Sequence, residues 1–317
     1  MSLSNIFRLG DTVKCNNNYY SILKKLGNGG SGAAYLALCT TGNYNGCYFV
    51  IKFFYQLDKE DRLKRFFKEI DFLKKCNHPS IIKLYEEGTH LYKGKSYPFY
   101  VMDYMPNTLQ NEIVKGPLSI EKTFMYTTQI LSALKYLKEQ DVLHRDIKPE
   151  NIFINGTQAI LGDFGLMKEI NSNDIDISDD IECLNESIFS DISIGDAMPF
   201  NFRTPQLVKY MIEKKPLDYK SDVFQLGISV VMMFTGKNPI ARAKLKSDDV
   251  KLIDSLGKIM GNINNTKYSK YIFNIVNGMI NFNEDNIKPP DELLNLSTTT
   301  FRNFLKDKKE LDGEILL

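Results

Sequence analysis

The hydrophobic pattern of this chain changes near residue 105, and the change limits the folds that it can adopt. Five short runs before this point are rich in β-forming residues and are separated by turns, several of which contain glycine: residues 20–26, 34–39, 48–54, 81–85 and 98–103. Alternating residue types over such short runs are typical of antiparallel strands. The first hundred residues therefore predict a small β-rich unit.

One amphipathic helix is predicted within this unit. The segment KEDRLKRFFKEIDFLKKC, residues 59–76, repeats apolar side chains at intervals of three and four between charged positions: Leu63, Phe66, Phe67, Ile70 and Leu73. Such spacing places these side chains on one face of a helix.

The chain after residue 105 has a helical pattern instead. Apolar residues recur at helical spacing in four segments: residues 123–140, 219–234, 248–260 and 268–280. The 317 residues, of which 43% are hydrophobic, suffice for one large domain or two ordinary ones. The pattern predicts an α+β fold in which a β-rich lobe precedes a mainly helical lobe.

Overall charge and hydropathy argue against several classes of protein. Lys and Arg number 40 and Asp and Glu 39, so a formal charge of +1 gives no reason to expect a nucleic-acid partner. The longest apolar run, residues 228–234, is too short to span a bilayer, and the N-terminus lacks the apolar core of a secretory signal. We therefore expect a soluble protein with no membrane partner.

The five cysteines are scattered and form no C-x-x-C pair: Cys15, Cys39, Cys47, Cys76 and Cys183. Their spacing indicates neither a zinc site nor a disulfide framework. Free thiols in a reducing compartment are the simpler interpretation, so we expect a cytoplasmic location.

The segment LGNGGSGAAYLAL carries three glycines in the order G-x-G-x-x-G: Gly27, Gly29 and Gly32. Glycines at this spacing let a backbone approach phosphate groups without interference from Cβ atoms. A strand follows the loop here, whereas a helix follows it in dinucleotide-binding folds. The loop therefore favours a hairpin folded over a nucleotide.

An ionic residue, Lys52, interrupts the apolar strand FVIKFF. A lysine in such a place must either reach solvent or find a carboxylate. Glu69 in the following helix is the natural partner, since a paired ammonium group can hold phosphate oxygens in a fixed position. A solvated lysine and a surface glutamate are the alternatives.

Three oxygen-bearing side chains stand in two nearby motifs. Asp146 and Asn151 lie five residues apart in VLHRDIKPENIFI, and Asp163 follows a strand in ILGDFGL. Side chains of this kind suit the binding of Mg²⁺ and the orientation of a hydroxyl group.

The order of these motifs, from the glycine loop through the V-x-K strand and the helix glutamate to H-R-D-x-K-x-x-N and D-F-G, resembles the eukaryotic-type (Hanks-type) protein kinase superfamily. The resemblance covers roughly residues 20–296 and implies a bilobal protein-kinase-like fold. The implied layout is an N-terminal extension, an N-lobe and a C-lobe that form one kinase domain over residues 19–296, and a C-terminal tail: residues 1–18, 19–103, 104–296 and 297–317.

The resemblance implies ATP and Mg²⁺ as cofactors and gives the motif residues their roles. Lys52, paired with Glu69, would hold the α- and β-phosphates, and Lys148 would neutralise charge at the γ-phosphate. Asp146 would accept the proton of the substrate hydroxyl. The metal ion would be held by Asn151 and Asp163.

The same resemblance predicts which residues surround ATP: Leu26, Gly27, Gly29, Gly32, Ala34, Val50, Lys52, Met102, Asp103, Met105 and Phe153. Residues 103–105 would form the hinge that binds adenine through its backbone, with Met102 as gatekeeper. Ala34 and Val50 are exchanged relative to the usual pattern. Because the exchange nearly conserves side-chain volume, we expect the adenine pocket to be kept, with a changed shape on the side that these two residues form. Phe153, on the opposite side of adenine, would narrow the pocket.

The resemblance also implies an internal scaffold for these loops. Leu73, His144 and Phe164 would stack into a hydrophobic column. Asp222, in SDVFQLG, would anchor the catalytic loop from a buried helix.

The activation-segment insert, about residues 169–197, is unusually long and acidic. Since the whole chain carries +1 and residues 169–202 carry nine acidic and no basic side chains, the remainder carries +10. Four apolar residues in it recur at helical spacing: Ile177, Ile181, Leu184 and Ile188. The insert is therefore either a solvated loop or an amphipathic helix that inhibits the site or binds a regulatory partner. Arg145 often accompanies control by phosphorylation in this family, and four serines are candidate phosphosites: Ser178, Ser187, Ser190 and Ser193.

The stretch MPFNFRTPQLVKYM departs from the family pattern at two positions. Gln206 replaces a glutamate that pairs with an arginine, and the arginine position is Lys288. Because both sides have changed, we expect a remodelled contact between them. Pro199 is typical of tyrosine kinases, whereas Lys148 is typical of the serine/threonine branch. We weigh Lys148 more heavily, because HRDIKPEN aligns without a gap, and expect transfer to Ser or Thr.

Three functions compete for this sequence. They are an ATP-dependent protein kinase, a small-molecule kinase of related fold, and a pseudokinase that binds nucleotide and partners without catalysis. Folding alone does not require the set Lys52, Glu69, Asp146, Asn151 and Asp163, so the set favours catalysis on a protein substrate. The physiological substrate and the oligomeric state stay open.

Overall fold

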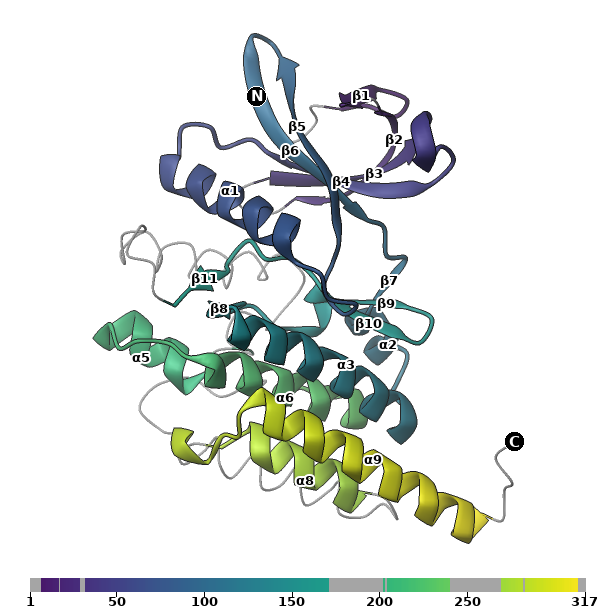
Figure 1. Ribbon diagram of the computed structural model, residues 1–317, viewed down its shortest axis with the longest axis vertical. Coiled ribbons are helices and arrows are strands. Elements are labelled where there is room, and N and C mark those ends of the chain that lie inside the picture. Colours follow the sequence, from purple (N-terminus) through teal and green to yellow (C-terminus); the bar gives the residue numbers. More distant parts are fainter. Residues whose placement is uncertain are drawn as a thin grey trace. The chain divides into compact units, whose positions relative to one another are not determined.

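The described residues form two compact units, which divide between Met105 and Pro106 (Figure 1). The structure is a computed structural model and describes residues 7–16, 18–28, 32–170, 202, 204–239, 269–281 and 283–312. The first unit is built on a β-sheet and the second is mainly helical, which confirms the predicted α+β class.

The first unit contains one antiparallel sheet of six strands in the order β1-β2-β3-β4-β6-β5. The strands are β1 (Thr12–Cys15), β2 (Asn18–Asn28), β3 (Gly32–Cys39), β4 (Tyr48–Phe54), β5 (Leu84–Tyr92) and β6 (Lys95–Asp103). Four of them correspond to predicted runs, whereas β5 overlaps the predicted run 81–85 only at Leu84 and Tyr85. The short strand β1 was not predicted.

The pleat of this sheet separates a buried face from the face that carries Lys52. Burial alternates strictly along β3, and its buried residues join a hydrophobic core that includes Tyr35 and Phe53. On the opposite face Ala34 pairs with Lys52, and Lys52 pairs with Tyr100 of β6. Directly paired residues of an antiparallel sheet point to the same side. Lys52 therefore projects away from the apolar core.

Residues that precede the predicted kinase domain also belong to the first unit. Phe7 is buried, with its ring centroid 4.6 Å from those of Phe53 and His90. Glu86 of β5 accepts hydrogen bonds from Asn18 Nδ2 at 2.5 Å and from the Tyr20 hydroxyl at 2.9 Å. The start of the chain is thus tied both to the core and to the far edge of the sheet.

Helix α1 (Glu60–Lys75) buries Phe66, Ile70 and Leu73 of the predicted stripe, but polar residues share the buried face with them. The buried residues are Arg62, Arg65, Phe66, Glu69, Ile70 and Leu73. Leu63 is only half-buried and Phe67 is 46% exposed, so the prediction of both for the apolar face was wrong. The stripe includes Glu69 because this carboxylate has partners inside the unit.

The second unit is a helical bundle with two small sheets. Its helices are α2 (Leu109–Val114), α3 (Ile120–Glu139), α5 (Pro205–Glu213), α6 (Tyr219–Thr235), α8 (Ser269–Met279) and α9 (Pro290–Asp312). Its strands are β7 (Asn107–Thr108), β8 (Val142–Leu143), β9 (Ile152–Asn155), β10 (Gln158–Leu161) and β11 (Lys168–Glu169). The predicted helix at residues 248–260 lies outside the described residues. No helix in the described part of the chain has the length and apolar character needed to cross a membrane.

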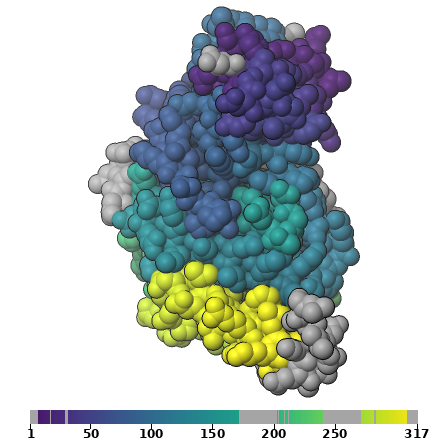
Figure 2. All heavy atoms as spheres, turned by 45° about the vertical axis from the view of Figure 1, so that its right-hand side comes forward, coloured from purple at the N-terminus to yellow at the C-terminus, as the bar shows by residue number. Residues whose placement is uncertain are grey.

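Helix α9 lies along α3 and across the surface of this unit, where its yellow atoms are visible in Figure 2. Phe304 of α9 stacks on Phe124 of α3 with centroids 6.1 Å apart, and Thr128 and Ser297 share a hydrogen bond of 2.7 Å. One continuous helix therefore crosses the boundary that the sequence predicts at residue 296.

Candidate active site in two parts

In the first unit, Lys52 and Glu69 form an ion pair. The Lys52 Nζ lies 2.9 and 3.2 Å from the two carboxylate oxygens of Glu69, whose side chain is 2% exposed. The hydroxyl of Tyr100 donates to the same carboxylate at 2.8 Å. The pairing is that of the predicted phosphate-binding lysine, and neither a solvated lysine nor a surface glutamate fits it.

Four predicted nucleotide-site residues share the face of the sheet that carries Lys52. Ala34 pairs with Lys52, and Val50 pairs with Met102 two residues along the ladder. Because side chains two residues apart point to the same side, these four side chains line one surface. Val50 is buried and the others are partly exposed.

The glycine loop needs glycine at one described position for a steric reason. A Cβ on Gly32 would collide with the carbonyl oxygen of Phe53, whereas a Cβ on Gly27 would meet nothing within 4 Å. Gly29 lies outside the described residues. Gly32 is therefore required by strand packing, apart from any approach of phosphate.

The predicted hinge follows the end of β6. Asp103 accepts a hydrogen bond from the Tyr85 hydroxyl at 2.8 Å, and its backbone N–H donates to the carbonyl of Lys83 at 3.1 Å. Met105 is half-buried, and Leu26, at the end of β2 near the glycine loop, is exposed. Asp103 is thus held by both its side chain and its amide.

In the second unit, the loop after β8 gathers three of the predicted catalytic residues. Asn151 Nδ2 donates to the backbone oxygen of Asp146 at 2.8 Å and to its Oδ2 at 2.9 Å, and Lys148 Nζ lies 3.3 Å from that Oδ2. A 3₁₀ turn spans Pro149–Asn151, and the backbone N–H of Asn151 donates to the carbonyl of Lys148 at 2.9 Å. The turn explains why a spacing of five residues places Asn151 beside Asp146.

Helix α6 anchors this loop through Asp222, as the resemblance implies. The two carboxylate oxygens of Asp222 accept the backbone N–H groups of His144 at 2.7 Å and Arg145 at 2.8 Å. Full burial raises the pKa of Asp222, although the nearby His144 and these hydrogen bonds oppose that shift. The anchor therefore sits in a water-excluded place.

His144 and Phe164 are in contact within the second unit, with ring centroids 4.6 Å apart. Burial lowers the pKa of His144, and its Nε2 lies 3.0 Å from the carbonyl of Gly162. Leu73, the third residue of the predicted column, is buried in the first unit. The structure thus shows two members of the column side by side.

Two residues of the site adopt left-handed backbone conformations that are uncommon without glycine. Arg145 has φ +68° and Asp163 has φ +57°. Such conformations persist where surrounding contacts hold them, and they concentrate at functional sites. The Asp163 side chain is exposed, whereas Phe164 beside it is fully buried. Phe153 is half-buried on β9, opposite Thr108 and Ile160.

The donor set fits a metal ion that is shared with phosphate. Within the described ranges, no group of three or more His, Cys, Asp and Glu side chains could hold a metal by itself. Asn151 uses its nitrogen toward Asp146, which leaves Oδ1 as the atom able to ligate. A Mg²⁺ held by Asn151 and Asp163 would need further oxygens, and nucleotide phosphates supply them.

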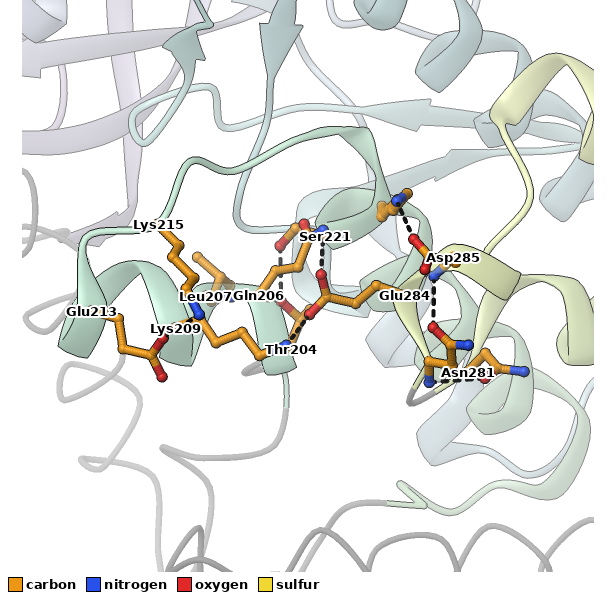
Figure 3. Close-up of polar contacts among 12 residues, drawn as sticks. Thr204, Gln206, Leu207, Lys209, Glu213, Lys215, Ser221, Asn281, Glu284 and Asp285 are labelled. Carbon is orange, nitrogen blue, oxygen red and sulfur yellow. Dashed lines mark hydrogen bonds and ion pairs between the residues drawn. The ribbon is translucent and has the colours of Figure 1, made fainter.

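Gln206 at the start of α5 is held by carboxylates (Figure 3). Its Nε2 donates to Asp218 Oδ1 at 3.1 Å and to Glu284 Oε2 at 3.2 Å, and Lys209 Nζ lies 2.8 Å from the other Glu284 oxygen. Burial would raise the pKa of Glu284, but hydrogen bonds from Lys209 and Gln206 outweigh it and lower this pKa.

The predicted contact between Gln206 and Lys288 was therefore wrong. Lys288 pairs instead with Glu292, one helical turn away, at 2.6 Å, and both side chains are exposed. The physical reason is that an amide N–H₂ group needs acceptors, which Asp218 and Glu284 supply and a lysine does not.

Several predicted positions lie outside the described residues. They are Gly29, Pro199 and the four candidate phosphosites Ser178, Ser187, Ser190 and Ser193. The acidic insert, apart from its first residues, lies outside them as well. Its interpretation as a loop or a helix stays a prediction.

Sequence reasoning assigned no role to three residues that contact the site residues. Tyr100 bonds to Glu69, Glu284 bonds to Gln206, and Gln225 bonds to the backbone on both sides of Asp146. A signal was available for Gln225, because a glutamine within an apolar helix must find partners in the interior.

Comparison with known proteins places these motifs in context. A family model described as the protein kinase domain matches residues 20–292. A probable serine/threonine-protein kinase of Clostridium acetobutylicum is 27% identical over 225 residues, which are 70% of this chain and 31% of that protein. The serine/threonine-protein kinase PrkC of Bacillus subtilis is 26% identical over 69% of this chain and 31% of its own length. The serine/threonine-protein kinase stk11 homolog of Dictyostelium discoideum is 30% identical over 56% and 28%. The chain spans less than a third of each of these relatives.

Proposed function

We propose, from the premise that the chain belongs to the protein kinase family, that it transfers the γ-phosphate of ATP to a serine or threonine hydroxyl of a protein. The observation that carries the proposal is the contact of Asn151 and Lys148 with the carboxylate of Asp146. Folding alone does not require three polar groups to converge on one loop.

The chemistry follows from what each group can do. The Asp146 carboxylate accepts the proton of the attacking hydroxyl, and Asn151 holds that carboxylate in place. Lys148 adds positive charge where charge develops on the transferred phosphoryl group. Lys52, fixed by Glu69, holds the α- and β-phosphates.

We propose Mg²⁺ as the metal ion that the protein binds together with ATP. When bound, it would neutralise phosphate charge, held by Asp163 and by Oδ1 of Asn151. Lys148 supports the serine/threonine preference. We further propose that the acidic insert regulates the site or binds a partner, and that the protein is cytoplasmic, which the lack of a C-x-x-C pair in its sequence supports.

The domain layout is also part of the proposal. The kinase domain would include β1, because this strand pairs with β2, and the whole of α9, because this helix packs on α3. The boundaries at residues 18 and 296 would then move outward.

The test is transfer of labelled phosphate from ATP to the protein itself and to a generic protein substrate. The wild type is compared with Asp146→Asn and with Asp141→Asn, a matched control in which the same change is made at an exposed carboxylate. We expect the first variant to lose transfer by a factor on the order of 100 or more and the control to keep it. Phosphoamino-acid analysis of the product then tests the serine/threonine preference.

Equal transfer by the wild type and Asp146→Asn would end the kinase proposal. Binding of ATP without any Asp146-dependent transfer would indicate the pseudokinase instead. A thermal shift with ATP and Mg²⁺ measures that binding independently.

A further inference from the structure

Gln225 is a buried polar residue that the proposed chemistry leaves unexplained. It lies on α6 and is 2% exposed, within a run from Ser221 to Met233 in which every residue is buried. An amide in such a place costs free energy unless its donors and acceptor find partners.

The amide of Gln225 makes three hydrogen bonds to the backbone. Its Oε1 accepts the N–H of Ile147 at 2.9 Å, and its Nε2 donates to the carbonyls of Arg145 and Phe202, each at 3.1 Å. Turning the amide over would set N–H₂ against an N–H group and oxygen against two carbonyls. The partners therefore fix one orientation of the side chain.

Two of these bonds enclose Asp146, because Arg145 and Ile147 are its neighbours in the chain. Arg145 is also the residue with the left-handed φ of +68°. A conformation of this kind persists only where neighbouring contacts hold it. Asp222 holds the N–H of Arg145, and Gln225, one turn further along α6, holds its carbonyl.

The third bond reaches the segment that leads into α5. Phe202 lies two residues before Thr204, whose hydroxyl caps α5 and shares a hydrogen bond of 2.9 Å with Ser221 of α6. The same stretch of α6 therefore contacts both the catalytic loop and the start of α5.

We propose that Gln225 is a positioning residue that orients Asp146 and ties this orientation to the segment before α5. The inference rests on the proposed kinase function, because it assigns Asp146 as the proton acceptor. Gln225 touches neither substrate nor nucleotide in this role. It acts through the backbone on each side of Asp146.

The experiment replaces Gln225 with methionine, which is similar in length but forms none of these bonds, and with glutamate, which keeps the acceptor and loses both donors. Ser229→Ala is the matched control, because Ser229 is buried on the same helix and, among the residues that the structure describes, its hydroxyl bonds only to the helix carbonyl of Gln225. We expect both Gln225 variants to lower kcat on the order of 10- to 100-fold with the KM for ATP unchanged. The control should keep kcat.

The readout that separates positioning from stability is the same substitution in an Asp146→Asn background. If Gln225 acts through Asp146, Gln225→Met removes no further activity there. A further loss as large as that in the wild type would overturn the proposal, because the substitution would then act independently of Asp146.

A second measurement does not depend on catalysis. Hydrogen exchange at the Ile147 amide should be faster in Gln225→Met than in Ser229→Ala, and equal exchange in the two would also overturn the proposal. A wild type without Asp146-dependent transfer would instead refute the kinase function. The exchange result would then still show whether Gln225 holds the loop.

Discussion

Gln206 stands at the position where sequence reasoning predicts that the kinase pattern has glutamate, yet its surroundings are unsuited to a carboxylate. Its side chain is buried, and its N–H₂ group faces Asp218 and Glu284. Restoring the usual glutamate would place three carboxylates together. Like charges in contact destabilise a protein, and the cost rises with their burial, which is here nearly complete for Gln206 and partial for Asp218 and Glu284.

We therefore predict that Gln206→Glu lowers the free energy of unfolding by about 2–4 kcal/mol. The second substitution Glu284→Gln should restore much of the loss, since it exchanges the acid and the amide across the contact. Urea unfolding of the two variants measures both effects. Wild-type stability of the single variant would contradict the contact between Gln206 and Glu284.

The pH dependence of stability tests the same contact through Glu284. The pKa of this carboxyl is lowered from its ordinary value of 4.5, so the folded protein binds its proton less tightly than the unfolded chain does. The resulting stabilisation is complete above pH 4.5 and is lost as the pH falls through the lower folded pKa. Lys209→Met removes one of the hydrogen bonds that cause the shift.

We predict that Lys209→Met is less stable than the wild type at neutral pH and that the difference narrows below about pH 4. Urea unfolding at both pH values is the measurement. Lys288→Met is the control, because its exposed pair with Glu292 is worth about 0.5 kcal/mol or less. A difference for Lys209→Met that does not change with pH would argue against its action on Glu284.

At single residues, sequence reasoning succeeded where local geometry fixes the partner. The pleat and the helix that follows bring Lys52 to Glu69, and a buried aspartate on α6 meets the catalytic loop. Sequence reasoning failed to find the partner of Gln206. This partner, Glu284, lies 78 residues away, and its approach depends on tertiary structure. No spacing of residues in the sequence indicates that Gln206 and Glu284 come into contact.

At the scale of elements, α1 shows how a helix buries polar residues in place of apolar ones. Phe66 is 5% exposed and lies with its ring centroid 5.3 Å from Phe54 and 5.5 Å from Tyr100, whereas its neighbour Phe67 is 46% exposed. The spacing of apolar residues predicted that both rings lie on the apolar face of the helix. The buried face of the helix carries Glu69, which pairs with Lys52, together with Phe66, and Phe67 lies outside that face.

The two adjacent rings allow a matched comparison. We predict that Phe66→Leu costs about 1–3 kcal/mol of unfolding free energy, because it leaves space in a packed core. Phe67→Leu should change stability by less than about 0.5 kcal/mol. Thermal or urea unfolding distinguishes them, and equal losses would mean that α1 is rotated from the orientation described.

Elements with strong periodicity were predicted well, and those stabilised by tertiary contacts were missed. The long apolar patterns of α3 and α6 were sufficient by themselves. Helix α9 includes the run Ser297–Thr300, whose β-branched threonines lower helix propensity. Packing against α3 compensates for this low helix propensity. Such packing between distant segments leaves no local pattern in the sequence.

At the scale of the whole molecule, helix α9 supports the unit that carries the predicted catalytic loop. Ion pairs join α9 to both ends of α3, from Lys138 to Asp291 at 2.9 Å and from Lys308 to Glu121 at 2.8 Å. Between them Phe304 is buried against Phe124. The residues of α9 beyond 296 thus complete the core of the second unit.

We predict that a chain ending at residue 296 unfolds at a markedly lower temperature than one ending at residue 312. The shorter chain loses Phe304, whose removal alone costs about 3–5 kcal/mol, and exposes the ring of Phe124 to water. Phe304→Ala in the full chain is the companion variant, because it keeps the helix and removes only the ring. If the melting temperatures of the two truncated chains agree, α9 contributes nothing beyond residue 296, and the kinase domain ends where its motifs end.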